Sequence, residues 1–214
     1  MNRELLTNNY LIVKNFISKE IALDLGLSFI EYSKIVKKSN PLHCDEIDGN
    51  PINYAFRVHS PKNGQDLLYG KCDEVSNIVG CKLLPTYSYA RVYKNGSFLP
   101  IHKDRSACEI SLTVHLDGDT SWPIYITNPQ ALPIECNLQP GDAVLYLGCL
   151  AHHWRFKYTG ENYAQVFLHY VREDGLYSET AKTFGNEYLE DPEKLIEEYK
   201  QIFPSFTSYY HDRF

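Results

Sequence analysis

The sequence predicts a mainly β fold with flanking helices, of the sandwich or jelly-roll type. Short strand-like segments follow one another from residue 85 to residue 171, and turn signals such as Asn95-Gly96 and Pro140-Gly141 separate them. Helical spacing of apolar residues is found before and after this region. Several short strands at such intervals are typical of a sandwich or a jelly roll.

The individual elements follow from local pattern. Runs rich in β-branched and aromatic residues predict strands at 10–16, 53–59, 86–93, 109–116, 122–127, 134–138, 143–147 and 163–171. Apolar spacing of three and four residues predicts helices at 19–37, 66–79 and 192–202, and polar residues with two prolines predict a loop over 38–51. We expect one domain over 1–214, in which 1–84 and 172–214 support a β core at 85–171.

Composition narrows the function classes. The chain has 214 residues, 21 Lys and Arg against 27 Asp and Glu, and a net charge of −6, which disfavours a large nucleic-acid or anionic-membrane interface. No apolar run approaches the roughly 20 residues that a membrane span needs. The N-terminus lacks an apolar signal stretch, so we expect a cytoplasmic protein. Its six cysteines are then expected to be thiols: Cys44, Cys72, Cys81, Cys108, Cys136 and Cys149.

The residues that indicate chemistry are two histidine motifs. In His102-Lys103-Asp104, residues two apart on an extended chain project to the same face, so His102 and Asp104 can share a ligand. About 50 residues later, the strand 143–147 leads to His152 and His153. Two imidazoles and one carboxylate form the facial triad of non-haem Fe(II) oxygenases. The alternatives are a chance motif and buried histidines with structural hydrogen bonds.

Five stretches carry a family resemblance: Tyr89-Ala-Arg91-Val-Tyr93 with Asn95-Gly96, Ile101-His-Lys-Asp-Arg105, Pro140-Gly-Asp142 with Leu145, His153-Trp154-Arg155, and Gln165-Val-Phe-Leu-His-Tyr170. Together they resemble the prolyl-4-hydroxylase-like branch of the 2-oxoglutarate- and Fe(II)-dependent dioxygenases. The resemblance implies a double-stranded β-helix, which is the cupin-like form of the jelly roll. It also implies Fe(II) as cofactor and 2-oxoglutarate as co-substrate, oxidised to succinate and CO₂ while a C–H bond is hydroxylated.

The resemblance also implies a ligand set. It places the second histidine ligand immediately before Trp154-Arg155, which selects His153 alongside His102 and Asp104. Neighbours on a strand face opposite ways, so His152 would then point elsewhere. Asp142 is expected to hold a turn rather than to react, and Trp122 and Trp154 are expected in the core or the pocket wall.

The co-substrate's distal carboxylate requires a cation. In the resembled branch a Lys or Arg stands nine or ten residues after the last ligand, but here that position falls on Asn162 or Tyr163. Tyr93 matches a tyrosine that contacts 2-oxoglutarate, and alternation then turns Arg91 inward with it. We expect Arg91 to clamp the carboxylate, with Arg155 as the next candidate. The alternative for Arg91 is a salt bridge to a buried acid such as Glu109.

The strand 109–116 alternates between polar and apolar residues. Glu109, Ser111, Thr113 and His115 share one face, and Ile110, Leu112, Val114 and Leu116 share the other. A polar inner face would line a wet pocket while the apolar face packs on the helices. His115 falls where the branch has another co-substrate tyrosine, and Gln165 is expected to face the same cavity. Structural roles for both are equally compatible with the sequence.

These observations favour an enzyme, a 2-oxoglutarate-dependent non-haem iron dioxygenase. By analogy the substrate is a prolyl or other residue in a protein or peptide, bound near 38–51, 60–66 and 172–214. The alternatives are a nucleic-acid or small-molecule oxygenase of the same superfamily, and a non-catalytic metal-binding cupin module. A zinc site on the same fold is also compatible with these ligands.

Overall fold

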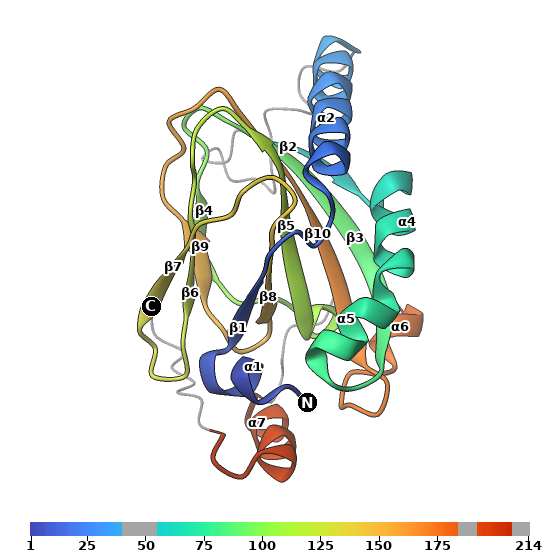
Figure 1. The fold of residues 1–214 in the computed structure, drawn as a ribbon, viewed down its shortest axis with the longest axis vertical. Helices are drawn as coiled ribbons and strands as arrows, with labels where there is room; N and C mark the ends of the chain where they lie inside the picture. Colours follow the sequence, from blue (N-terminus) through green and yellow to red (C-terminus); the bar gives the residue numbers. More distant parts are fainter. Residues whose placement is uncertain (40–54, 184–191, 207–214) are drawn as a thin grey trace.

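The computed structural model describes residues 1–39, 55–183 and 192–206, and its centre is a pair of β sheets that face each other (Figure 1). The larger sheet is antiparallel throughout, in the order β1 (Tyr10–Val13), β8 (Ala143–Leu147), β5 (Ile110–Gly118), β10 (Asn162–Arg172), β3 (Leu83–Lys94) and β2 (Ala55–His59). The smaller sheet has the order β4 (Leu99–His102), β9 (His153–Arg155), β6 (Ile124–Thr127) and β7 (Pro133–Cys136). The predicted jelly roll is confirmed.

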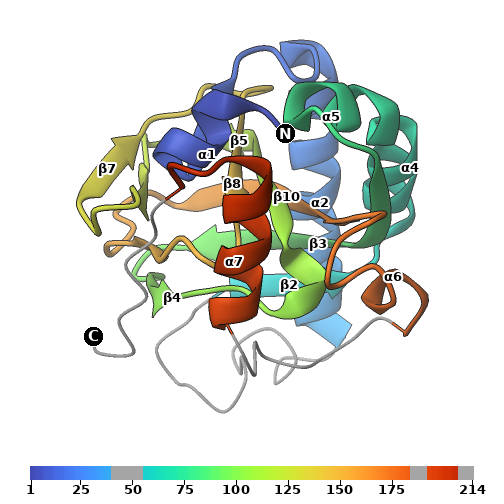
Figure 2. The ribbon, with the colours of Figure 1, turned by 90° about the horizontal axis from the view of Figure 1, so that it is seen from below.

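Helices cover the outer face of the larger sheet. They are α2 (Lys19–Ser39), α4 (Lys62–Gly70) and α5 (Cys72–Val79), which lie along one side of the molecule in Figures 1 and 2. Figure 2, which views the molecule from below, shows α7 (Pro192–Ile202) at the near end with α1 (Arg3–Asn8) beside it. The short elements are η1 (Ser106–Cys108) and α6 (Thr180–Thr183). The helices therefore leave the space between the inner faces of the two sheets for a functional site.

Strand β5 shows why the sheet has an apolar outside and a polar inside. Ile110, Leu112, Val114 and Leu116 are completely buried in the main hydrophobic core with the helices. Ser111, Thr113 and His115 alternate with them on the opposite face. The expected alternation is confirmed for these residues, and it places a row of polar groups between the sheets.

Glu109 does not follow this alternation. It has helical backbone angles (φ −53°, ψ −45°) directly after η1, so its side chain leaves the strand pattern. Its carboxylate accepts from Nε of Arg172 at 2.6 Å, from the Arg172 backbone N–H at 3.0 Å and from the Tyr199 hydroxyl at 3.0 Å. Arg172 also reaches Glu198 at 2.7 Å. Glu109 thus attaches α7 to β10, and it is not the partner of Arg91.

Several element boundaries differ from the prediction. The helix expected at 66–79 is two helices, because Lys71 (φ −100°, ψ −1°) interrupts it between α4 and α5. The strand expected at 10–16 ends at Val13, since Asn15 takes a left-handed φ of 51°. Helix α1 was not expected, although the Asn2 side chain caps it by accepting from the N–H groups of Glu4 and Leu5. The loop predicted at 38–51 falls, from residue 40 on, outside the described residues.

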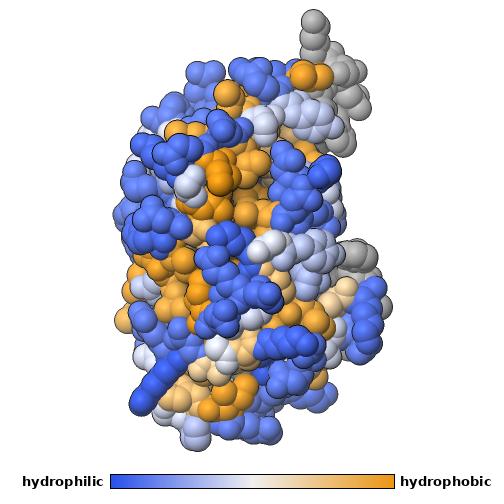
Figure 3. All heavy atoms as spheres, turned by 45° about the vertical axis from the view of Figure 1, so that its right-hand side comes forward, coloured by the Kyte–Doolittle hydropathy of each residue, from blue (hydrophilic) through white to orange (hydrophobic). Residues whose placement is uncertain are grey.

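The surface of the molecule is mixed in polarity. The face in Figure 3 carries many hydrophilic residues with apolar ones between them. No helix in the described ranges is long and apolar enough to cross a membrane. The cysteines that the structure describes form no disulfide: Cys72, Cys81, Cys108, Cys136 and Cys149. Between the sheets, Ile124 and Ile126 of β6 form an apolar cluster with Val144 and Tyr146 of β8, so the two sheets are in contact there.

Candidate active site

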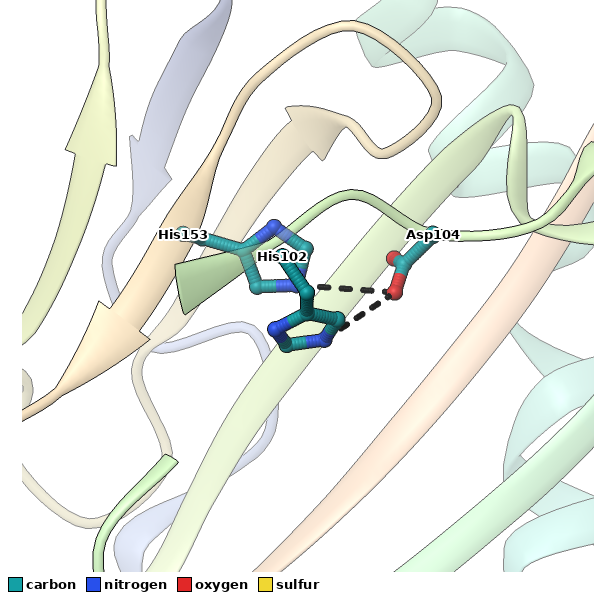
Figure 4. Close-up of side chains that lie close together, drawn as sticks. All are labelled: His102, Asp104 and His153. Atoms are coloured by element: carbon teal, nitrogen blue, oxygen red, sulfur yellow. Dashed lines mark ion pairs between the residues drawn. The ribbon is translucent and has the colours of Figure 1, made fainter. Parts of the chain in front are cut away.

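Three side chains that the sequence singled out converge between the sheets. His102 ends β4, His153 begins β9, and the two residues are paired across these strands. Asp104 lies on the loop after β4, and one of its carboxylate oxygens is 3.7 Å from Nε2 of His102 and 3.5 Å from Nε2 of His153 (Figure 4). Atoms bound to one metal ion at roughly 2.1 Å lie roughly 3 Å or more apart. The three donors are therefore spaced to share an ion.

Backbone carbonyls fix which nitrogen of each ring faces Asp104. Nδ1 of His102 lies 2.8 Å from the carbonyl oxygen of Pro100, and Nδ1 of His153 lies 3.1 Å from that of Ala151. A carbonyl can only accept, so each Nδ1 carries the proton and each Nε2 keeps its lone pair. This second hydrogen bond is the usual way in which proteins orient a histidine ligand toward a metal.

Hydrogen bonds to its side chain and to its backbone hold Asp104 in place. The Ser111 hydroxyl donates to its second carboxylate oxygen at 2.8 Å, and the Asp104 backbone N–H donates to the Gly148 carbonyl at 2.8 Å. A Cβ at Gly148 would lie 2.7 Å from the carboxylate and would also collide with the Cys108 carbonyl oxygen, so only glycine fits there. Burial opposes ionisation of Asp104, but the surrounding imidazoles of His153, His169 and His102 outweigh it and hold the pKa of Asp104 well below its usual value. The carboxylate is therefore charged.

His102 is held neutral. Burial in the cavity wall, together with the nearby His153, lowers the pKa of His102 to about 4. A neutral imidazole is the form that binds a metal. Two imidazoles and one carboxylate suit Fe(II), and the same donors suit Zn(II).

The structure distinguishes between the two adjacent histidines. His153 is 2% exposed and belongs to the group of donors around Asp104. His152 is outside that group, and its backbone N–H donates to the Thr127 hydroxyl at 3.0 Å. The side that each residue faces follows from strand alternation at the start of β9.

The triad opens into a cavity of about 610 Å³. Its wall contains aromatic residues, namely Tyr87, Tyr89, Tyr93, Tyr146 and Phe167. It also contains four cationic residues, namely Arg57, Arg91, Lys103 and Arg105, and two histidines outside the triad, His59 and His169. A cavity of this size is in the range of small-molecule sites.

Two arginines approach one polar cluster from opposite sides. From the cavity side, Nη1 of Arg91 lies 3.4 Å from the Tyr93 hydroxyl, and the Gln165 amide nitrogen lies 3.4 Å from the same hydroxyl. From the far side, Nη2 of Arg155 donates to the Gln165 amide oxygen at 2.9 Å. Arg155 is 1% exposed, and its guanidinium also contacts the rings of Trp122 and Tyr163. In the described chain neither arginine has a carboxylate partner.

Two buried polar atoms near this cluster lack a hydrogen-bond partner among the described residues. They are Nε of Arg155 and Nδ1 of His115. Both side chains lie against Tyr163, whose ring stacks on His115 at 4.4 Å. A buried polar atom without a partner is costly, so this region fits a bound polar ligand such as a carboxylate.

Asp142 and Trp122 have the structural roles expected for them, whereas Trp154, expected in the core or the pocket wall, is half-buried and belongs to neither. Asp142 accepts from Nζ of Lys14 and from the backbone N–H groups of Asn15 and Gln139, so it holds a turn. Trp122 is buried beside Tyr93, whereas Trp154 stacks on Tyr125 on the outer side of β9. Asn162, at the usual anchor position, accepts instead from the Lys94 ammonium.

The sequence did not single out much of the cavity wall. His169 follows Gln165 and Phe167 at intervals of two on β10, so alternation could have placed it there. His59 and Arg57 come from β2, and their positions depend on the pairing of β2 with β3. No local pattern in the sequence reveals that pairing.

Comparisons with known proteins concern the fold. No protein-family model matches the sequence, and no curated protein matches it. Among solved structures, a prolyl-4-hydroxylase from Pseudomonas putida is 12% identical over 79% of this chain and 95% of its own, with a TM-score of 0.58. The non-haem α-ketoglutarate-dependent carbocyclase SnoK from nogalamycin biosynthesis is also 12% identical, over 89% and 94%, with a TM-score of 0.60.

A third similar structure contains the ligands themselves. The epimerase SnoN, in complex with Fe³⁺, α-ketoglutarate and nogalamycin RO, is 10% identical over 78% of this chain and 80% of its own, with a TM-score of 0.59. The chain has the fold of the 2-oxoglutarate-dependent non-haem iron oxygenases. The double-stranded β-helix expected from the sequence is thereby confirmed. In this oxygenase fold, His102, Asp104 and His153 lie together at the wall of the cavity between the sheets.

Proposed function

We propose that the protein is an Fe(II)- and 2-oxoglutarate-dependent oxygenase that hydroxylates a C–H bond of its substrate. The observation that carries the proposal is the convergence of two imidazole Nε2 atoms and an ionised carboxylate on one point of a cavity in the oxygenase fold. The overall reaction balances as substrate–H, 2-oxoglutarate and O₂ giving substrate–OH, succinate and CO₂.

His102, Asp104 and His153 would hold the iron. Bound iron supplies the redox chemistry that couples 2-oxoglutarate decarboxylation to hydroxylation, and three protein ligands leave coordination positions for co-substrate and O₂. The chain's own contribution is to fix the donors. Pro100 and Ala151 orient the rings, and Ser111 orients the carboxylate.

The cluster around Gln165 would hold the distal carboxylate of 2-oxoglutarate. Of the two candidate arginines, we favour Arg155 as its counter-charge, because it is almost fully buried and its Nε has no partner among the described residues. His115, Tyr93 and Gln165 would add hydrogen bonds, and Arg91 meets the same cluster through the Tyr93 hydroxyl. A planar guanidinium can hold a carboxylate through two parallel hydrogen bonds, which lysine cannot do.

The similar structures leave the substrate class open within the proposal. One is a prolyl-4-hydroxylase, and others are an epimerase and a carbocyclase of nogalamycin biosynthesis. A prolyl residue in a peptide and a small molecule are both substrates that this fold can accept. Fold-level analogy cannot choose between them, and the lining of the cavity must do so.

The experiment is succinate release with Fe(II), 2-oxoglutarate and O₂, each omitted in turn. We expect slow uncoupled succinate formation by the purified protein, lost when any component is omitted and in His153→Ala. The matched control is His152→Ala, which should behave as the native protein. Succinate that is released equally with Zn(II), or equally by His153→Ala, would contradict the proposal.

A further inference from the structure

We infer that the substrate is a small molecule that carries a carboxylate, with this group bound at Arg91 and its body against the ring wall of the cavity. The inference rests on the proposed function, because it assigns the space beside the proposed iron ligands to the substrate. Arg155 would then bind the co-substrate, and Arg91 would bind the substrate.

Arg91 has an unusual environment for a buried cation. The Arg91 side chain lines the cavity, and the residue is only 9% exposed. Its polar contacts are two tyrosine hydroxyls, Tyr89 and Tyr93, each at 3.4 Å, and its guanidinium lies over both rings at 5.4 and 5.5 Å. No carboxylate in the described chain pairs with it. A buried guanidinium held only by long, neutral contacts is stabilised further when an anion approaches from the cavity.

The strand register places Arg91 between the cluster around Gln165 and the cavity wall at Arg57. On β3 it is paired with Gln165 of β10 on one side and with Arg57 of β2 on the other. Gln165 belongs to the cluster that includes Arg155, whereas Arg57 belongs to the cavity wall. Arg91 therefore stands at the boundary: it lines the cavity, whereas Gln165 and Arg155 are not among the described lining residues. A ligand in the cavity reaches Arg91 without passing the co-substrate cluster.

The charge of the wall is opposite to that of the chain. Arg57, Lys103 and Arg105 line the same cavity as Arg91, and among the described lining residues Asp104, a proposed metal ligand, is the only carboxylate. The whole chain carries a net charge of −6. Arg91, which no described carboxylate neutralises, favours an anion over an amine in this cavity.

Flat rings form the part of the wall beyond Arg91. His59 stacks on Tyr87 at 4.9 Å, and Tyr87 lies 4.6 Å from His169. Phe167 continues the same surface, parallel to His169 at 6.3 Å. Such a surface favours an apolar or planar body next to the anionic group. The volume of about 610 Å³ suits a small molecule rather than a folded partner.

The test uses a matched set of probes, namely 3-phenylpropanoate, its neutral amide 3-phenylpropanamide, and the cation phenethylamine. They are titrated calorimetrically into protein saturated with Mn(II) and 2-oxoglutarate, so that the co-substrate cluster is already filled. We expect the carboxylate to bind about tenfold or more tightly than the amide, and the amine to bind weakest.

Two variants and a control localise the effect. Arg91→Gln should reduce the preference for the carboxylate to about twofold or less while 2-oxoglutarate affinity stays within about threefold. Arg91→Lys keeps the charge and should keep a preference for the carboxylate, with circular dichroism showing that both variants fold. Lys62→Gln removes a positive charge from the exposed surface of α4 and should match the native protein.

The outcomes separate this inference from the proposed function. Equal binding of carboxylate and amide by the native protein, or an unchanged preference in Arg91→Gln, would overturn the inference alone. Loss of 2-oxoglutarate binding in Arg91→Gln but not in Arg155→Gln would make Arg91 the co-substrate anchor and also overturn it. A native protein that binds Mn(II) but no 2-oxoglutarate would instead refute the proposed function.

Discussion

Replacing Ser111 by alanine should weaken metal binding although Ser111 touches no metal position itself. Its hydroxyl donates to one carboxylate oxygen of Asp104 at 2.8 Å, and the other oxygen faces the two histidines. Ser111 is completely buried, so water cannot replace the lost donor without entering the packed core. The same hydroxyl is 3.0 Å from Nδ1 of His169, which holds it in place. Ser111→Ala therefore leaves Asp104 charged but less firmly oriented.

The size of the effect follows from the type of bond. A hydrogen bond to a charged acceptor contributes about 1.5–3 kcal/mol, and loss of a group that orients a metal ligand typically costs about 10- to 100-fold in metal affinity. We expect the Kd for Mn(II), measured calorimetrically on metal-free protein, to rise by about that factor. The free energy of unfolding without metal should fall by about 1.5–3 kcal/mol, because a buried hydrogen bond to the charged carboxylate is lost.

The matched control is Thr113→Ala, two residues along the same face of β5. Its hydroxyl lies 3.5 Å from that of Tyr146 and contacts no proposed ligand. This variant should bind Mn(II) within about twofold of the native protein, which corresponds to less than half a kcal/mol. Native-like metal affinity in Ser111→Ala, or an equal loss in Thr113→Ala, would refute the argument that Asp104 is positioned through Ser111.

Three further predictions concern packing and charge. Gly148→Ala should abolish Mn(II) binding and lower the free energy of unfolding by about 1–3 kcal/mol, because its Cβ would collide with the Cys108 carbonyl; native-like titration and denaturation curves would contradict this. Arg172→Met should lower the free energy of unfolding by about 3–5 kcal/mol in a denaturant titration, because it leaves the buried Glu109 carboxylate without its charge partner. A loss below about 1 kcal/mol would argue against this ion pair as a stabilising contact. Burial raises the pKa values of all five described cysteines, so at pH 8 they stay protonated and should react slowly with a thiol reagent. In the unfolded protein we expect close to six reactive thiols, and two or fewer would indicate disulfides.

The elements that the sequence predicted best are those governed by local pattern. The alternation along β5 depends only on neighbours two residues apart, so the inward side of Ser111 and the outward side of Leu112 could be predicted. His102 and Asp104 are likewise two apart, and their distance from His153 in sequence follows from the resemblance. Glu109 broke the pattern because η1 gives it a helical backbone, and nothing in the alternation indicates that short turn.

The rest of the site depends on contacts between distant segments. Arg155 meets Gln165 of β10 and the Trp122 carbonyl before β6, so its burial arises from three separate parts of the chain. The ring wall needs β2, β3 and β10 side by side, although six other strands separate β10 from β3 in the sequence. Pairing of this kind is decided by the whole sheet, so no local pattern could place His59, whereas alternation along β10 could have placed His169.

The measurement that tests the central claim most directly is an anaerobic titration of the protein with Fe(II) and then 2-oxoglutarate, followed by visible absorption. Fe(II) chelated by a 2-oxo acid gives a metal-to-ligand charge-transfer band that Fe(II) or the acid alone does not give. The account predicts a saturable band with one iron per chain in the native protein and in His152→Ala, and no band in His153→Ala or Asp104→Ala. A band retained in His153→Ala, or absent from the native protein with iron bound, would contradict it.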